Sequence, residues 1–191
     1  MSKSQNIRKE TGLLLHWIES GSNLVVKASL GRRLEQGHPN RLDIYIISWF
    51  ILQVILTITL IFTSLSGAAE IIIIVVLVYR LFEISITNFD SVFVRVMQKK
   101  SHKSVPRLFS LIFVNYIEMI LIFGIIYELL IVDASMARSL NYSVSLATLS
   151  GISFDNPTTG LYIAGIFEML LGVFFVTGAI GAIASYIGEK E

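Results

Sequence analysis

The chain of 191 residues contains no cysteine and only three histidines. Without cysteine there can be no disulfide, no thiolate metal ligand and no cysteine nucleophile. The histidines, His16, His38 and His102, lie far apart in polar segments, so we expect solvated or interfacial side chains rather than a metal site. The sequence also offers no paired carboxylates and no nucleophile with a matching base, and we therefore expect that the chain is not an enzyme.

Charge is scarce as well. Asp, Glu, Lys and Arg together make up 15% of the residues, whereas 54% are hydrophobic. A soluble domain needs a charged surface, so this balance predicts a protein whose outer surface faces lipid. The formal net charge of +1 does not indicate a nucleic-acid partner, and we expect membrane lipid as the surroundings.

Four stretches are apolar enough to cross a bilayer, which takes a helix of about 20 apolar residues. They are residues 44–65, 71–86, 108–132 and 161–187. Helices are predicted because an open sheet would leave backbone groups unpaired in lipid. Lys and Arg gather before the first stretch and between the second and third, whereas only Arg138 lies between the third and fourth. The positive-inside rule then predicts that both termini lie in the cytoplasm, and we expect a multi-pass protein of the plasma membrane.

These stretches divide the chain into three parts. Residues 1–42 are expected to be a cytoplasmic segment without a cleaved signal, because charges interrupt its short apolar run. Within it, residues 16–34 read as amphipathic helix, which either lies on the membrane or packs as a cap on the helix bundle. Residues 43–104 are predicted to form a transmembrane hairpin with a basic cytoplasmic linker, and residues 105–191 a unit of two helices joined by a long loop.

That loop, residues 133–160, is too polar for a fifth span and too apolar in its middle, at residues 140–149, for an ordinary connection. It predicts a half-length helix that re-enters the membrane, followed by a turn back through small and hydroxyl residues. Non-helical backbone is tolerated at such depth only where it lines a cavity. The C-terminal end of a helix carries partial negative charge, and backbone carbonyls could complete a cation site there.

The sequence Asn-Tyr-Ser-Val-Ser-Leu-Ala-Thr-Leu-Ser-Gly at residues 141–151, followed by Pro-Thr-Thr at 157–159, resembles the pore loop of the two-span potassium channel family. Residues 164–174, Ala-Gly-Ile-Phe-Glu-Met-Leu-Leu-Gly-Val-Phe, are similar to that family's inner helix. The likeness covers the last two spans and their loop, which would form a pore domain. The expected fold is an all-α membrane protein of four transmembrane helices, with a re-entrant pore helix and loop between the third and fourth and an N-terminal amphipathic helix.

The resemblance implies a selectivity filter made of Thr148, Leu149, Ser150, Gly151, Ile152 and Ser153. The family's usual filter reads Thr-Thr-Val-Gly-Tyr-Gly-Asp, and this chain agrees with it only at Thr148 and Gly151. The resemblance further implies a hinge of the inner helix at Gly172 and a cavity that includes Thr177 and Gly181. Taken without the resemblance, the small residues of this helix favour close helix packing in the membrane.

The function implied is that of a subunit of a tetrameric cation channel with an atypical filter, because one loop supplies only a quarter of a carbonyl ring. Such a channel conducts a monovalent cation, K⁺ or Na⁺, passively and needs no other cofactor. The alternative is a non-conducting, channel-like scaffold or sensor in the membrane, which the departures from the usual filter favour. A transporter subunit is disfavoured, because the first two spans carry no inverted repeat of the last two.

The charged residues Arg80, Glu83, Glu118 and Glu168 lie deep within the predicted spans. A charge at such depth costs about 2.5–3.5 kcal/mol on the insertion scale, so each needs a partner or water. Arg80 and Glu83 share a helix face, and Glu118 lies at comparable depth, which predicts a network that fastens the hairpin to the pore unit. Glu168 is expected to bond the pore-helix region of a neighbouring subunit or to face other polar groups. A voltage sensor would need several Arg or Lys at every third position, and the second span has Arg80 alone.

Overall fold

The computed structural model describes residues 39–63, 67–89, 105–131, 135–150 and 158–188. These ranges contain α-helices and no strand, so the predicted all-α class is confirmed for this part of the chain. The helices are α3 (Pro39–Phe62), α4 (Ala68–Phe89), α6 (Val105–Leu130), α7 (Met136–Ala147) and α8 (Thr159–Gly188). The predicted amphipathic helix at residues 16–34 and most of the basic linker, residues 90–104, lie outside the described residues.

Three of the described helices are long and apolar enough to cross a membrane, and they indicate a membrane protein. The qualifying segments are Asp43–Phe62 in α3, Phe109–Leu130 in α6 and Thr159–Gly181 in α8. The second predicted span coincides with α4, which is not among the three. This helix carries Glu70, Arg80 and Glu83, and two of these charged side chains are buried against other helices of the chain.

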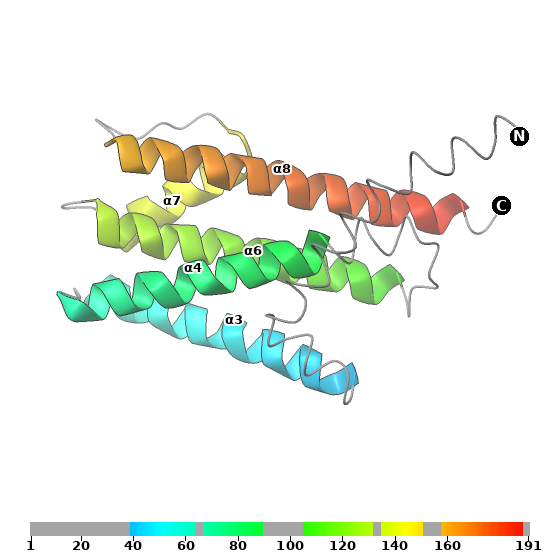
Figure 1. The fold of residues 1–191 in the computed structure, drawn as a ribbon, viewed down its shortest axis with the longest axis horizontal. Helices are drawn as coiled ribbons and strands as arrows, with labels where there is room; N and C mark the ends of the chain where they lie inside the picture. The colour runs from blue at the N-terminus through cyan, green and yellow to red at the C-terminus, as the bar shows by residue number, and fades with distance from the viewer. Residues whose placement is uncertain (1–38, 64–66, 90–104, 132–134, 151–157, 189–191) are drawn as a thin grey trace, which may run out of the picture.

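Helix α6 lies in the middle of the bundle (Figure 1). The hairpin of α3 and α4 packs along one side of α6, and α8 packs along the other. Half of the span in α6 is buried inside the molecule, compared with 22% of the span in α3 and 28% of that in α8. The short helix α7 slants between α6 and α8 at one end of the bundle and contacts both.

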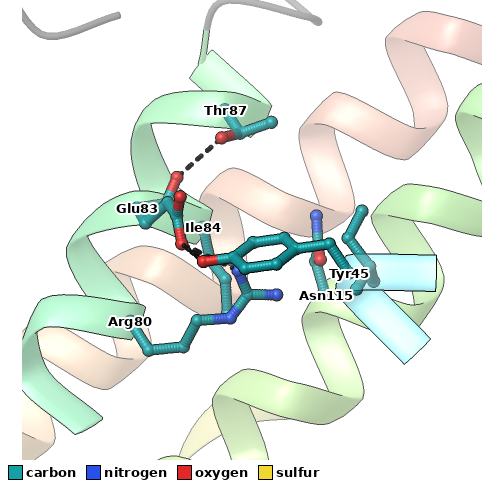
Figure 2. A pocket seen from close by; sticks show the side chains of 7 residues that line it. Tyr45, Arg80, Glu83, Ile84, Thr87 and Asn115 are labelled. Atoms are coloured by element: carbon teal, nitrogen blue, oxygen red, sulfur yellow. Dashed lines mark hydrogen bonds and ion pairs between the residues drawn. The ribbon is translucent and has the colours of Figure 1, made fainter. Parts of the chain in front are cut away.

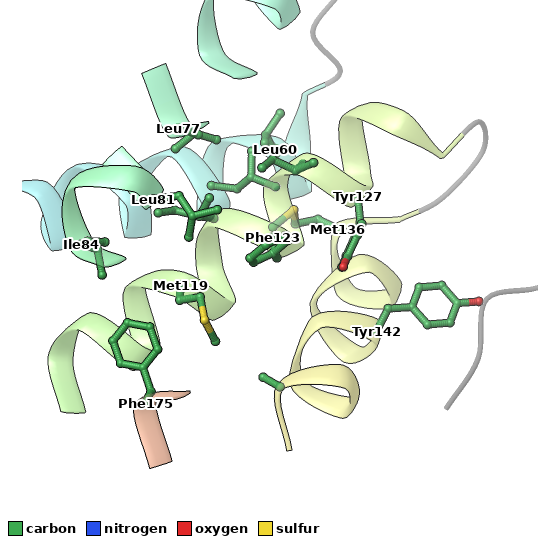
Figure 3. Packing of buried hydrophobic residues seen from close by; sticks show 14 of the residues in the cluster. Leu60, Leu77, Leu81, Ile84, Met119, Phe123, Tyr127, Met136, Tyr142 and Phe175 are labelled. Atoms are coloured by element: carbon green, nitrogen blue, oxygen red, sulfur yellow. The ribbon is translucent and has the colours of Figure 1, made fainter. Parts of the chain in front are cut away.

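The hydrophobic core is built around α6. Met119, Ile122 and Tyr127 of α6 have no exposed surface at all. The hairpin adds Leu60 and Leu77 from one side, α7 adds Met136 and Tyr142, and α8 adds Phe175 (Figure 3). The same core therefore joins the hairpin, the half-length helix and the last helix into one body.

Local sequence explains where several helices begin and end. Pro39 and Pro106 stand at or beside the first position of α3 and α6, where a missing backbone N–H costs nothing. Gly67, just before α4, has a φ of +68°, a left-handed conformation that glycine adopts without steric cost. Helix α7 begins at Met136, ahead of the apolar residues 140–149 that predicted it, because the Ser135 side chain caps it by accepting from the backbone N–H of Arg138.

Candidate functional site

The middle of α7 is tied to both neighbouring helices through one buried carboxylate. Glu168 of α8 is fully buried, and its Oε2 accepts a hydrogen bond of 2.6 Å from the Tyr127 hydroxyl of α6. The Ser143 hydroxyl of α7 forms a hydrogen bond with Oε1 of Glu168. The same hydroxyl lies 2.8 Å from the carbonyl oxygen of Ile120. Three helices thus meet at Glu168, and the polar groups that Glu168 faces belong to its own chain.

A second contact holds the first turn of α7. The hydroxyl of Ser139, which is fully buried, donates to Oε2 of Glu128 on α6 at 3.1 Å. Ser139 and Ser143 are four residues apart and therefore share one face of α7. This pair of serines is the signal in the sequence that could have identified the face of α7 that packs on α6. The sequence did not identify Tyr127 and Glu128 as partners, because they follow only from the packing of α6 against α7.

The C-terminal end of α7 is closed by donors from within the chain. The N–H of Ser150 donates to the carbonyl of Ser145 at 2.8 Å, and the N–H of Leu149 donates to the carbonyl of Leu146 at 3.2 Å. With Leu149 in the left-handed conformation, at a φ of +57°, these two bonds form a Schellman motif. Leucine is unusual there, because the left-handed conformation costs a residue with a Cβ roughly 1–2 kcal/mol.

The remaining carbonyls of the last turn are also occupied. The Thr148 hydroxyl donates to the carbonyl of Val144 at 2.7 Å, and the Thr148 N–H donates to the same oxygen at 3.0 Å. The Ala147 carbonyl accepts a hydrogen bond of 3.0 Å from the Tyr116 hydroxyl of α6. A carbonyl oxygen has two lone pairs, so these bonds satisfy the helix end without using all of its acceptor capacity.

Thr148, Leu149 and Ser150, the first half of the predicted filter, form this closing turn and are exposed. Gly151, Ile152 and Ser153, the second half, lie outside the described residues. The exposure of the described half means that no other described part of the chain covers the turn at residues 148–150.

The predicted hinge and cavity residues lie along α8. Gly172 is buried against the end of α7, and a Cβ atom at this position would lie 2.7 Å from the Ala147 carbonyl oxygen. Thr177 and Gly181 are exposed, and a Cβ atom added at Gly181 would meet nothing within 4 Å. The Thr177 hydroxyl donates to the carbonyl of Val173 in its own helix. Gly172 therefore allows close approach of α7, whereas Thr177 and Gly181 lie on an uncovered side of α8.

The predicted pairing of Arg80 with Glu83 and Glu118 is present in the structure. The Arg80 guanidinium donates from Nη1 to Glu83 Oε2 at 2.9 Å and from Nη2 to Glu118 Oε2 at 2.8 Å. Arg80 and both carboxylates are at least 97% buried. The bond to Glu118 joins α4 to α6, so it links the hairpin to the central helix.

Two aromatic residues of α3, which the sequence did not identify, complete this cluster. The Arg80 Cζ lies 5.3 Å from the ring centre of Tyr45 and 5.5 Å from that of Trp49, within the range of a cation–π interaction. The Tyr45 hydroxyl also donates to Glu83 Oε2 at 2.8 Å (Figure 2). Tyr45 and Trp49 are four residues apart on one face of α3, so both can cover a single guanidinium.

Comparison with known proteins finds no relative of this chain. No family model matches the chain, and neither a curated protein nor a solved structure matches it. Within the described residues, no group of three His, Cys, Asp or Glu side chains could hold a metal ion.

Proposed function

We propose that the chain is one subunit of a tetrameric cation channel of the potassium-channel type. In this proposal it spans the plasma membrane four times, with both termini in the cytoplasm. The observation that carries the proposal is the position of α7. A helix of 12 residues is about 18 Å long, which is too short to cross a bilayer. It is nevertheless packed between two helices that are long enough to cross and is bonded to both of them.

Helix α4 is the second of the four spans in the proposed topology. Its charged side chains are the obstacle, because an unpaired charge is costly at that depth. Arg80 has two carboxylate partners and two aromatic rings around its guanidinium, and this shell lowers the cost of placing α4 in the membrane. The apolar side chains of α4 that remain exposed, such as Ile71, Ile72, Val75 and Phe82, then face lipid.

Four copies are proposed because α8 and the end of α7 are incompletely covered in one chain. Only 28% of the span in α8 is buried, and its exposed residues include large apolar side chains such as Ile166, Leu170 and Val173 together with Thr177 and Gly181. Small residues allow helices of neighbouring subunits to approach closely in a membrane. In the tetramer, residues 148–153 of each chain surround the axis and supply oxygen ligands to a permeant K⁺ or Na⁺.

The alternative, a non-conducting channel-like scaffold or sensor, is favoured by a different observation. The carbonyls of the last turn of α7 all accept hydrogen bonds from donors in the chain, and the turn closes through a left-handed leucine. A helix end that is satisfied in this way does not require a cation. The two candidates share one fold and differ only in whether residues 148–153 pass ions.

Reconstitution in liposomes distinguishes the channel from the non-conducting scaffold. The purified chain is placed in liposomes, K⁺ and Na⁺ fluxes are followed with a pH-coupled dye, and the oligomer is counted by native mass spectrometry. The channel proposal predicts four copies and a flux above that of empty liposomes. Gly151→Ala should alter this flux, whereas the control Asn156→Ala in the same loop should not. Four copies without flux would support the scaffold, and monomers without flux would contradict both candidates.

A further inference from the structure

A small pocket lies between the hairpin and α6, beside the Arg80 cluster (Figure 2). Tyr45 and Ile46 of α3 line it, as do Arg80, Glu83, Ile84 and Thr87 of α4 and Asn115 of α6. It lies in the half of the bundle where α3 begins and α4 ends. The centre of a water molecule can occupy about 10 Å³ of this pocket. That is room for roughly one water.

Two buried polar atoms of the residues that line this pocket lack a hydrogen-bond partner among the described residues. They are Nε of Arg80, a residue only 2% exposed, and Oδ1 of Asn115, a residue 3% exposed. The other atoms of both groups are engaged, because Arg80 binds two carboxylates through its Nη atoms and Asn115 Nδ2 donates to Asn88 Oδ1 at 3.3 Å. Leaving a buried donor or acceptor unsatisfied costs about 1–3 kcal/mol.

We propose that this pocket is a binding site for water, which accepts from Arg80 Nε–H and donates to Asn115 Oδ1. The free donor and the free acceptor need a ligand that can both accept and donate, which water does and a metal cation or a halide does not. The charges agree with a neutral ligand. The Arg80 guanidinium repels a cation, and the Glu83 carboxylate, which lines the same pocket, repels an anion.

The bound water is part of what allows charge inside the bundle. Arg80, Glu83 and Glu118 form a buried cluster, and such clusters remain costly unless their remaining hydrogen-bonding positions are satisfied. A water held at Arg80 Nε supplies a partner to the one guanidinium nitrogen that has none among the described residues. The inference rests on the proposed placement of α4 in the membrane but not on conduction, so it stands if the chain proves to be a non-conducting scaffold.

Water-edited solid-state NMR of the full chain in liposomes tests the proposal. The Arg80 Nε signal, assigned by its loss in Arg80→Lys, should receive magnetisation from water several times faster than the backbone amides of Met119 and Ile122, which are fully buried in α6. Transfer to Arg80 Nε as slow as that to these two amides would overturn the proposal. This outcome leaves the flux measurement unaffected, so the two proposals can fail separately.

A matched pair of variants locates the water. Asn115→Leu keeps a side chain of similar size but removes the acceptor, and it should reduce transfer to Arg80 Nε to the level of the buried amides. Ile112→Leu alters another buried residue of α6 that does not line the pocket, and it should leave the transfer unchanged. Fast transfer that survives Asn115→Leu would mean that Arg80 is hydrated from elsewhere, and the site as proposed would be wrong.

Discussion

Gly172 of α8 lies against the last residue of α7, so close that a Cβ atom at position 172 would be 2.7 Å from the carbonyl oxygen of Ala147. The atom it would meet is backbone, which cannot move aside as a flexible side chain can. The contact fixes how closely the end of the half-length helix approaches α8. It also gives Gly172 a packing role that does not depend on any bending of α8.

The first prediction concerns this contact. Gly172→Ala should destabilise the protein by about 1–3 kcal/mol, because the added methyl group overpacks the contact between α7 and α8. Thermal unfolding in detergent measures the effect. Gly181→Ala is the matched control, since a Cβ at Gly181 meets open space and alanine favours helix more than glycine does. Equal losses in both variants would show that α7 does not approach α8 at Gly172.

The second prediction concerns the buried carboxylate of Glu168. Ser143→Ala and Tyr127→Phe each remove one donor to it, and each should cost about 1–3 kcal/mol. The double variant should lose an amount different from the sum, because both hydroxyls serve one carboxylate. Ser145→Ala is the control, since within the described residues the Ser145 hydroxyl bonds only to the carbonyl of Asn141 in its own helix. Additive losses would contradict a shared network.

A third prediction tests the link between the hairpin and α6. Arg80→Leu or Glu118→Gln should destabilise the protein by about 3–5 kcal/mol, since each leaves a buried charged or polar partner uncompensated. The double variant should lose clearly less than the sum. Asp43→Asn breaks a half-exposed ion pair with Arg107 and should cost only about 0–1 kcal/mol. If the Arg80 and Glu118 losses add, the pair does not fasten the hairpin.

The fourth prediction concerns the end of α7. Leu149→Gly should stabilise the protein by about 1 kcal/mol, because glycine adopts the left-handed conformation without the steric cost that leucine bears. Leu149 is largely exposed, so little apolar burial is lost. Leu149→Ala keeps a Cβ atom and should give no such gain in a thermal melt. A destabilising effect of glycine at residue 149 would contradict the left-handed turn.

Much of the described fold follows from the sequence alone. Long apolar stretches predict the three helices that are long and apolar enough to cross a membrane, and Pro106 marks the start of α6 because proline suits the first turn of a helix. Arg80 and Glu118 were predicted as a pair from their depth, since a buried charge requires a partner. These inferences succeed because they depend on local chemistry and on position along each helix.

Other features depend on contacts that sequence spacing does not reveal. The apolar residues 140–149 predicted a half-length helix without fixing its ends, and α7 is capped at Ser135 and closed by the left-handed Leu149, a residue type that rarely ends a helix. Tyr116 contacts the end of α7 because α6 packs there. Trp49 contacts Arg80 because α3 lies beside that residue. Partners this far apart in the sequence meet through tertiary packing, and no local periodicity encodes them.

The central proposal is that the end of α7 lies on the path of a permeant ion, and the natural absence of cysteine allows a direct test. Currents are recorded from liposomes that carry Ser150→Cys before and after a charged thiol reagent, with Phe113→Cys, an exposed position on α6, as the control. The proposal predicts a cation current that the reagent blocks in Ser150→Cys but leaves unchanged in Phe113→Cys. Absence of current, or a current that the reagent leaves unchanged in Ser150→Cys, would contradict it.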